Sequence, residues 1–180
     1  MERNLTHIAL FAALIAVLGL VPKIDLMAGV PITAQSLGIM LCGTVLGAKR
    51  GALAVLLFLL LVAAGLPLLA GGRGGLGVFA GPSVGYLVGF PIAAFVAGWI
   101  VERWSAPISI AAFAGAFIGG IPVLYAFGIP GMALMLDKTL PEAALLATPF
   151  LAGDMIKALL AALITRALAQ MRPGALLSRP

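Results

Sequence analysis

Six long apolar runs dominate the sequence, and they constrain the fold more than any other feature. They cover residues 5–21, 36–48, 51–66, 83–101, 108–127 and 143–169. A helix needs roughly 20 apolar residues to cross a hydrocarbon core about 30 Å thick. Only 9% of the 180 residues are charged and 63% are hydrophobic, whereas charged residues make up about 25% of a typical soluble domain. The sequence therefore predicts an all-α integral membrane protein, a bundle of six transmembrane helices forming a single membrane domain over residues 1–180.

The lysine and arginine residues between the runs indicate the orientation of the bundle. With six spans, both termini lie on one side of the membrane, and that side carries seven basic residues: Arg3, Lys49, Arg50, Arg103, Arg166, Arg172 and Arg179. The opposite side carries three: Lys23, Arg73 and Lys138. Because cytoplasmic loops are enriched in Lys and Arg, this asymmetry predicts cytoplasmic termini. The inverted topology stays open, since the C-terminal end contributes three of the seven. Residues 170–180 show no apolar face and are expected to form a disordered cytoplasmic tail.

Asp154 and Lys157 give the strongest functional signal, because they interrupt the apolar run 143–169. A charge at mid-bilayer costs roughly 2.5–3.5 kcal/mol on insertion scales, so an ionisable residue there indicates a functional site. Three positions apart on a helix, the two side chains share one face. They can neutralise each other there, or present an acceptor and a donor to a ligand. A salt bridge that only packs helices together is the alternative interpretation.

Two connecting segments on the non-terminal side are unusual for membrane loops. In residues 30–36, Thr33 or Ser36 can cap the second helix, which leaves Gln35 free to face inward. Residues 65–86 contain eight glycines among 22 residues, interleaved with leucine and phenylalanine. Glycine allows close backbone approach, so this segment predicts an ordered external lid whose N–H groups, that of Gly74 included, wrap a small ligand. A flexible linker is the alternative, although such linkers lack apolar residues.

Arg73 and Tyr86 are the candidate ligand contacts of that glycine-rich segment. A guanidinium on an exterior loop is a bidentate receptor for a carboxylate. Tyr86 lies one turn into the fourth predicted helix, where it can stack on a ligand or form a hydrogen bond with it. Both have ordinary alternatives, because Arg side chains snorkel to the membrane surface and Tyr is common in the interfacial belt.

Several function classes do not fit the residues present. The net charge of +5 is explained by topology, since basic and aromatic residues are not interleaved as in nucleic-acid binding. The glycines lack the Gly-Lys-Ser/Thr ending of a phosphate loop, so ATP coupling would need separate subunits. His7 is the only histidine and lies far from Ser83 and Cys42 in sequence, which argues against a hydrolase. Asp154 is the only acid within a run. Neither a metal site nor a cofactor is therefore expected.

Four stretches together resemble the BioY family, the biotin-binding S-components of energy-coupling-factor transporters. They are Val-Pro-Ile-Thr-Ala-Gln-Ser-Leu-Gly at 30–38, Gly-Ala-Lys-Arg-Gly at 47–51, the glycine-rich block continuing to 90, and Asp-Met-Ile-Lys at 154–157. The resemblance implies a six-helix bundle in a bacterial-type cytoplasmic membrane, with a substrate pocket on the outer side. It also implies that the small-residue face of the first helix, Ala9 and Ala13, meets a transmembrane coupling subunit driven by ATPase subunits. From the residues alone, packing within the bundle explains that face equally well.

Biotin, the ligand that the resemblance implies, matches the predicted site residues chemically. Its cyclic urea offers N–H donors and a carbonyl acceptor, so Asp154 would accept from the urea while Lys157 donates to a ligand oxygen. Arg73 and the lid N–H groups would hold the carboxylate, and Tyr86, Gln35 and Gly74 are the other predicted substrate-binding positions. The alternatives are an S-component for another small vitamin and a proton-coupled small-solute carrier that uses the Asp154–Lys157 pair.

Overall fold

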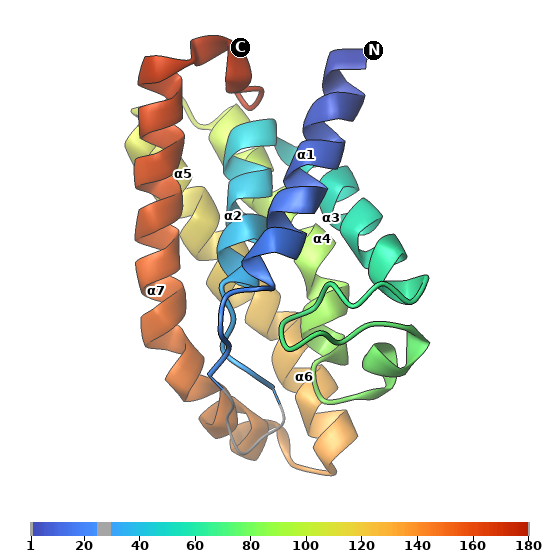
Figure 1. Cartoon of the computed structure of the whole chain (residues 1–180). Helices are drawn as coiled ribbons and strands as arrows, with labels where there is room; N and C mark the ends of the chain where they lie inside the picture. Colours follow the sequence, from blue (N-terminus) through green and yellow to red (C-terminus); the bar gives the residue numbers. More distant parts are fainter. Residues whose placement is uncertain (1, 25–29, 180) are drawn as a thin grey trace.

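The structure is a computed structural model that describes residues 2–24 and 30–179, and each of the six apolar runs is helical in it (Figure 1). The α-helices are α1 (Glu2–Leu18), α2 (Gln35–Leu46), α3 (Ala48–Ala63), α4 (Val84–Arg103), α5 (Ile108–Ile118), α6 (Leu124–Leu136) and α7 (Leu140–Met171). A π-helical segment, η2 (Gly119–Val123), joins α5 to α6, and 3-10 turns occur at η1 (Leu76–Ala80) and η3 (Pro173–Ala175). The described part of the chain contains isolated β-bridges and no strand. The fold is all-helical, as predicted.

The fifth apolar run forms a longer helix than the sequence indicated. It was predicted to end at residue 127, but α5, η2 and α6 are continuous from Ile108 to Leu136. Pro122 lies in the π-helical segment, where its missing N–H and its ring disturb the regular hydrogen-bond ladder. Gly119 and Gly120 let this segment pack closely, Gly119 against α4 and Gly120 against Met40 of α2. Proline and glycine are tolerated here because neighbouring helices pack around the distortion.

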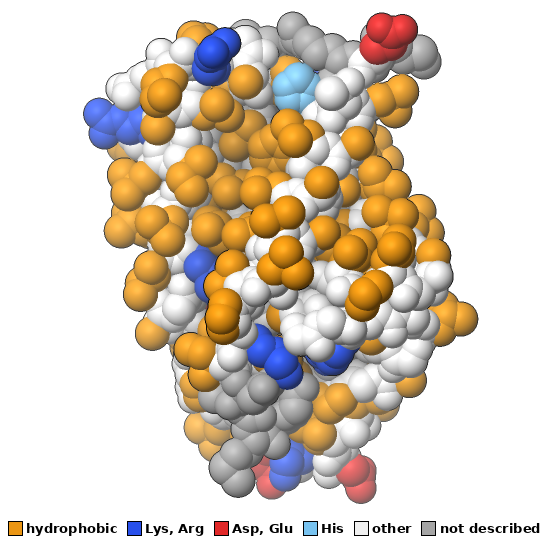
Figure 2. Space-filling view, viewed as in Figure 1, with side chains coloured by type: hydrophobic (Ala, Val, Ile, Leu, Met, Phe, Trp, Pro, Cys, Tyr) orange, Lys and Arg blue, Asp and Glu red, His pale blue; other side chains and the backbone are white. Residues whose placement is uncertain are grey.

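Three of the helices meet the length and hydropathy expected of a membrane span: α4, the helix Ile108–Leu136 and α7. Shorter apolar helices, α2 among them, complete the bundle. In the face seen in Figure 2, hydrophobic side chains cover the middle of the molecule, and the visible acidic side chains lie at its two ends. This distribution and the apolar helices indicate a multi-pass membrane protein.

Helix α2 is the central helix of the bundle. Every residue from Gly38 to Leu46 is buried, and α1, α3, α4 and α7 all pack against it. Gly43 permits the close approach of α4, because a side chain there would collide with the Ala94 carbonyl. Near the C-terminal end of α2, Thr44 accepts a hydrogen bond of 2.9 Å from Thr165 of α7. Small and polar residues therefore hold α2 within a bundle whose contacts are otherwise apolar.

The two connecting segments singled out by the sequence lie together at the end of the bundle opposite to both termini (Figure 1). Within 22–34, Ile24 pairs with Ile32, while residues 25–29 fall outside the described part of the chain. In the glycine-rich segment, Leu69 pairs with Arg73, and the Gly75 N–H donates to the Val62 carbonyl over 2.8 Å. Gly71 and Gly72 have φ values of 80° and 70°, which only glycine adopts readily.

Residues 170–180 were expected to be disordered, but residues 170–179 are ordered in the structure, and Pro180 lies outside the described residues. The N–H groups of Leu177 and Ser178 each donate to the Val45 carbonyl over 2.9 Å, and Ser178 Oγ donates to the Thr44 carbonyl over 2.6 Å. The last carbonyls of a helix lack partners within it, and those of α2 are buried. The tail satisfies them with two backbone N–H groups and the Ser178 hydroxyl, contacts that a search for apolar periodicity cannot detect.

Arg179 also attaches the C-terminal tail to the end of α4. Its guanidinium donates to the carbonyls of Val101, Trp104 and Ala106, where α4 ends. On the other side, Arg50 of α3 donates to the Leu177 carbonyl over 3.1 Å. The tail therefore joins the ends of α2, α3 and α4.

Candidate functional site

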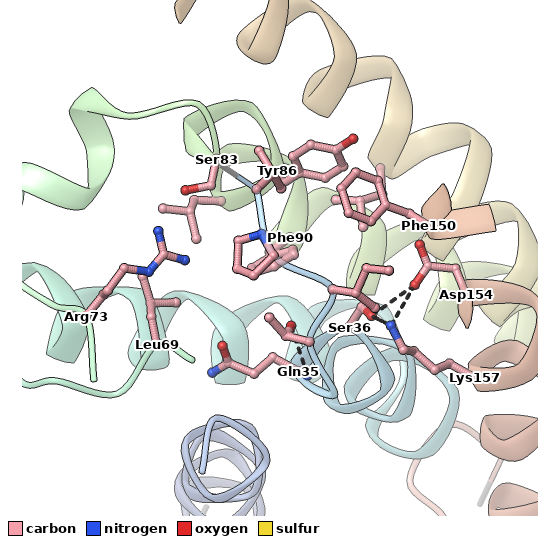
Figure 3. A pocket seen from close by; sticks show the side chains of 16 residues that line it. Gln35, Ser36, Leu69, Arg73, Ser83, Tyr86, Phe90, Phe150, Asp154 and Lys157 are labelled. Carbon is pink, nitrogen blue, oxygen red and sulfur yellow. Dashed lines mark hydrogen bonds and ion pairs between the residues drawn. The ribbon is translucent and has the colours of Figure 1, made fainter. Parts of the chain in front are cut away.

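A cavity opens between the helices at the end that carries the two connecting segments (Figure 3). Its empty space, which includes open solvent at the mouth, is about 580 Å³, and Figure 3 shows the side chains that line it. The lining comes from the segment before α2, the glycine-rich segment, α2, α4, α6 and α7: Val30, Pro31, Ile32, Thr33, Gln35, Ser36, Leu69, Arg73, Ser83, Tyr86, Leu87, Phe90, Leu124, Phe150, Asp154 and Lys157. Most of this surface is apolar, with a few polar groups at defined positions.

Asp154 and Lys157 lie at one side of this cavity as an ion pair. Lys157 Nζ is 3.0 Å from Asp154 Oδ1, and the two side chains are 14% and 8% exposed. Ser36 of α2 bridges them, because its Oγ donates to Asp154 Oδ1 over 3.1 Å and accepts from Lys157 Nζ over 2.9 Å. The predicted pair is therefore both an ion pair within α7 and a polar contact between α7 and α2. Its placement in the cavity wall is the position that a ligand-binding role requires.

Two tyrosines lie beside the carboxylate. Tyr125 of α6 donates its hydroxyl to Asp154 Oδ2 over 2.8 Å. Tyr86 of α4 lines the cavity, and its ring contacts the rings of Tyr125 and Phe150 edge-on, with centroids 6.1 and 6.0 Å apart. Among the residues that the structure describes, the buried hydroxyl of Tyr86 has no hydrogen-bond partner. Because an unpaired buried hydroxyl is unfavourable, a ligand that hydrogen-bonds to it would remove that penalty.

Arg73 lies at the side of the cavity away from Asp154 and Lys157 (Figure 3). Its Nε donates to the Ala70 carbonyl over 3.4 Å, which directs the planar end of the side chain toward the lined space. Phe90 and Tyr86 lie between Arg73 and the ion pair in this view. The cavity thus has a cationic group at one side, an ion pair at the other and aromatic rings between them.

Gln35 lines the cavity, but its amide is already engaged by the backbone. Its Nε2 donates to the carbonyls of Ile15 and Leu68, and its Oε1 accepts from the Ala70 N–H over 3.0 Å. Gln35 therefore joins α1, α2 and the glycine-rich segment, and it shapes the wall beside Arg73. The structure also places Gly74 outside the lining, where a side chain would collide with the Leu66 carbonyl.

Ala9 and Ala13 are exposed on the outward face of α1, whereas Ala12 is buried. Leu5, Leu10 and Val17 share this face and are more than half exposed. The two predicted docking residues therefore lie on a free apolar surface of the described chain and outside the bundle core. Within residues 2–24 and 30–179, no group of three or more His, Cys, Asp or Glu side chains is placed to hold a metal ion.

Sequence reasoning missed Tyr125 and assigned Ser36 only to helix capping. Tyr125 gives a weak signal, as one of only two tyrosines in the chain, but its run looks like lipid-facing helix. Ser36 is separated from Asp154 by 118 residues, so only the folded topology joins them. The apolar lining residues Leu87, Phe90 and Phe150 gave no signal above the composition of their runs.

Comparison with known proteins places this chain in a family. A sequence model described as the BioY family matches residues 2–174. The biotin transporter BioY of Rhodobacter capsulatus is 55% identical and covers 99% of this chain and 100% of its own length. The probable biotin transporter BioY of Bacillus subtilis is 43% identical over 89% of this chain and 87% of its own length.

A solved structure shares the fold. The S-component for biotin from an ECF-type ABC transporter superposes with a TM-score of 0.88 at 31% identity, covering 94% of this chain and 92% of that one. Family model, relatives and structure agree over nearly the whole length. The chain belongs to the BioY family.

Proposed function

We propose that this protein is the substrate-binding S-component of an energy-coupling-factor transporter and that it captures biotin. The observation that carries the proposal is the cavity itself, with the Asp154–Lys157–Ser36 cluster at one side, Arg73 at the other and apolar side chains between them. This is the polarity pattern of biotin, whose urea and carboxylate lie at opposite ends of an apolar ring and chain. The relatives are named biotin transporters, and the superposed structure is described as an S-component for biotin.

The urea of biotin fits the ion pair. An Asp154 oxygen would accept a urea N–H, while Lys157 would donate to the urea carbonyl. Because the pair is less than one-fifth exposed, these bonds are stronger than in water, and an analogue without the matching group would leave a buried charge unsatisfied. Such a penalty gives the site its selectivity. The hydroxyl of Tyr86 would gain a partner when a ligand enters.

The opposite end of the ligand lies near Arg73. The guanidinium would bind the valerate carboxylate, and the rings of Phe90 and Phe150 would contact the thiophane ring and chain. Gln35 supports this end from behind, since its amide bonds to the backbone of Leu68 and Ala70, five and three residues before Arg73. N–H groups of the glycine-rich segment would complete the lid, although Gly74 itself lies outside the cavity lining.

The transport role implies a membrane arrangement. We infer six spans in one membrane domain: α1, α2, α3, α4, the helix Ile108–Leu136, and α7. Both ends of the described chain lie at the same end of the bundle, as an even number of crossings requires (Figure 1). The excess of Lys and Arg at that end makes it cytoplasmic. The cavity then opens outward, where the ligand would be captured.

The energy for transport would come from other subunits. The exposed face of α1 with Ala9 and Ala13 would dock on a transmembrane coupling subunit linked to ATPases. Small residues at that face allow a partner helix to approach closely. This protein would itself be a transport component and no enzyme.

Equilibrium binding to the purified chain in detergent tests the proposal. Calorimetry should show one biotin bound per chain, with dethiobiotin bound more weakly and thiamine not bound. Binding of thiamine or another vitamin in place of biotin would support an S-component with a different substrate. Failure to bind any of them would contradict substrate capture by this chain.

A further inference from the structure

Tyr125 lies behind the cavity wall, yet it contacts the residue on which recognition depends. It is absent from the lining, and its hydroxyl donates to Asp154 Oδ2 over 2.8 Å. The side chain is buried, with 8% exposure. Its ring packs edge-on against Tyr86, which does line the cavity. Tyr125 can therefore influence a ligand only through Asp154 and Tyr86.

The π-helical segment explains why Tyr125 faces Asp154. Residues 119–123 form a π-helix, and Tyr125 follows two positions later. A π-bulge adds one residue to a helical turn, so it rotates everything after it by about 100° relative to a regular helix. Gly128, three positions beyond Tyr125, lies directly against the Tyr86 ring, and no side chain would fit there. The local geometry of α6 thus presents Tyr125 to the carboxylate and leaves room for Tyr86 beside it.

Counting hydrogen bonds shows what Tyr125 leaves for a ligand. Asp154 Oδ1 accepts from Ser36 and Lys157, and Oδ2 accepts from Tyr125. A carboxylate offers about four acceptor positions, so one remains, on Oδ2. Lys157 has three N–H donors, of which Ser36 and Asp154 use two. Within the described residues, the cluster therefore keeps one acceptor on Asp154 and one donor on Lys157, which match the N–H and the C=O of a urea.

We infer that Tyr125 is a positioning residue for recognition. Its hydroxyl donates to one of the two acceptor positions of Asp154 Oδ2, which fixes the rotation of the carboxylate. The other acceptor position of Oδ2 stays open to the ligand. The inference rests on the proposed function, because it assumes that Asp154 binds the urea of biotin. Tyr125 touches no ligand itself.

Tyr125→Phe tests the inference, since it removes the hydroxyl and keeps the ring that packs on Tyr86. Biotin affinity measured by calorimetry should fall about 10-fold to 100-fold, as for loss of a hydrogen bond to a charged group. The same substitution is then made in Asp154→Asn, whose binding is measured at higher biotin concentrations. There it should change the affinity less than about threefold, because the effects of two residues that act together do not add. A purely structural role for Tyr125 would give equal losses in both backgrounds and overturn the inference.

A second background covers the case in which Asp154→Asn does not fold. Ser36→Ala removes the donor to the other carboxylate oxygen. Its combination with Tyr125→Phe should depart from additivity by more than threefold, and additive losses would overturn the inference. If the wild type binds biotin tightly and Tyr125→Phe binds it with unchanged affinity, this inference is overturned and the proposed function stands. Absence of biotin binding by the wild type would overturn the proposed function and this inference with it.

Discussion

Replacing Asp154 by asparagine is the sharpest test of the site, because it changes a charge and almost no volume. The carboxylate lies 3.0 Å from Lys157 Nζ. At an effective dielectric constant of about 20, two unit charges at that separation attract each other by about 5.5 kcal/mol. Asparagine can keep its oxygen toward Lys157 and Ser36 and turn its amide toward Tyr125. The bonds to Lys157 and Ser36 then persist, but the Tyr125 hydroxyl loses the carboxylate oxygen to which it donates, and the charge of Lys157 has no counter-ion.

The expected cost follows from that uncompensated charge. Removing one partner of a buried, hydrogen-bonded pair costs about 2–5 kcal/mol in binding, and tenfold in Kd corresponds to about 1.4 kcal/mol. The affinity of Asp154→Asn for biotin should therefore fall by roughly two to three orders of magnitude. The thermal midpoint of the unliganded protein should fall as well, since Lys157 stays in the bundle without its partner.

A matched double variant separates binding from stability. Asp154→Asn combined with Lys157→Met removes both charges and fills a similar volume, which is often neutral or stabilising for a buried pair. Its thermal midpoint should recover toward that of the wild type, while biotin binding stays lost. If Asp154→Asn keeps its affinity within about threefold in calorimetry, the ion pair only packs α7 against α2, and the assignment of the site is wrong.

Three further predictions concern the rest of the molecule. Arg73→Ala should lower the affinity for biotin by about 10-fold or more and the affinity for biotin methyl ester by much less, because only biotin carries the carboxylate. Equal losses would show that Arg73 does not bind the carboxylate. Gly43→Val should lower the thermal midpoint and the yield of folded protein, since a side chain there collides with α4, whereas Gly77→Ala, with nothing within 4 Å, should match the wild type. Deleting the residues after Arg172 should lower the thermal midpoint, because the tail satisfies helix carbonyls. Biotin affinity at low temperature should stay within about threefold, since those carbonyls lie at the end of the bundle remote from the cavity. An unchanged midpoint would show that these hydrogen bonds add no stability.

The helices could be predicted from the sequence because their signal is local. Each apolar run became a helix, and five of the six have both ends within three residues of the prediction. The exception, the helix Ile108–Leu136, contains Pro122 and Pro130, which normally indicate a break. Whether proline ends a helix depends on the neighbours that pack around it, and a single run of sequence does not contain them. The tail was misjudged for the same reason, since its partners are carbonyls of α2.

The site residues also fall into two groups, those with a local sequence signal and those whose partners lie far away in the sequence. Asp154 and Lys157 could be identified because charges are rare within apolar runs, and Arg73 because it is the only charge in a glycine-rich segment. Gln35 was expected to face inward, and it does, with its amide bonded to backbone. Ser36 and Tyr125 could not be linked to Asp154, because their partners are 118 and 29 residues away. Long-range polar contacts of this kind depend on topology, here on the π-helical segment before Tyr125.

The ion pair also bears on how the chain enters the bilayer during synthesis. Asp154 and Lys157 belong to the same helix, three positions apart, so they can neutralise each other as soon as α7 forms, before it meets α2. The last helix can then leave the translocon without carrying an isolated charge into lipid. Ser36 and Tyr125 belong to helices that are inserted earlier, and they form their hydrogen bonds with the pair when α7 docks. If Asp154 and Lys157 bind the ligand as proposed, the nascent chain gains the capacity to capture it only after α7 has docked.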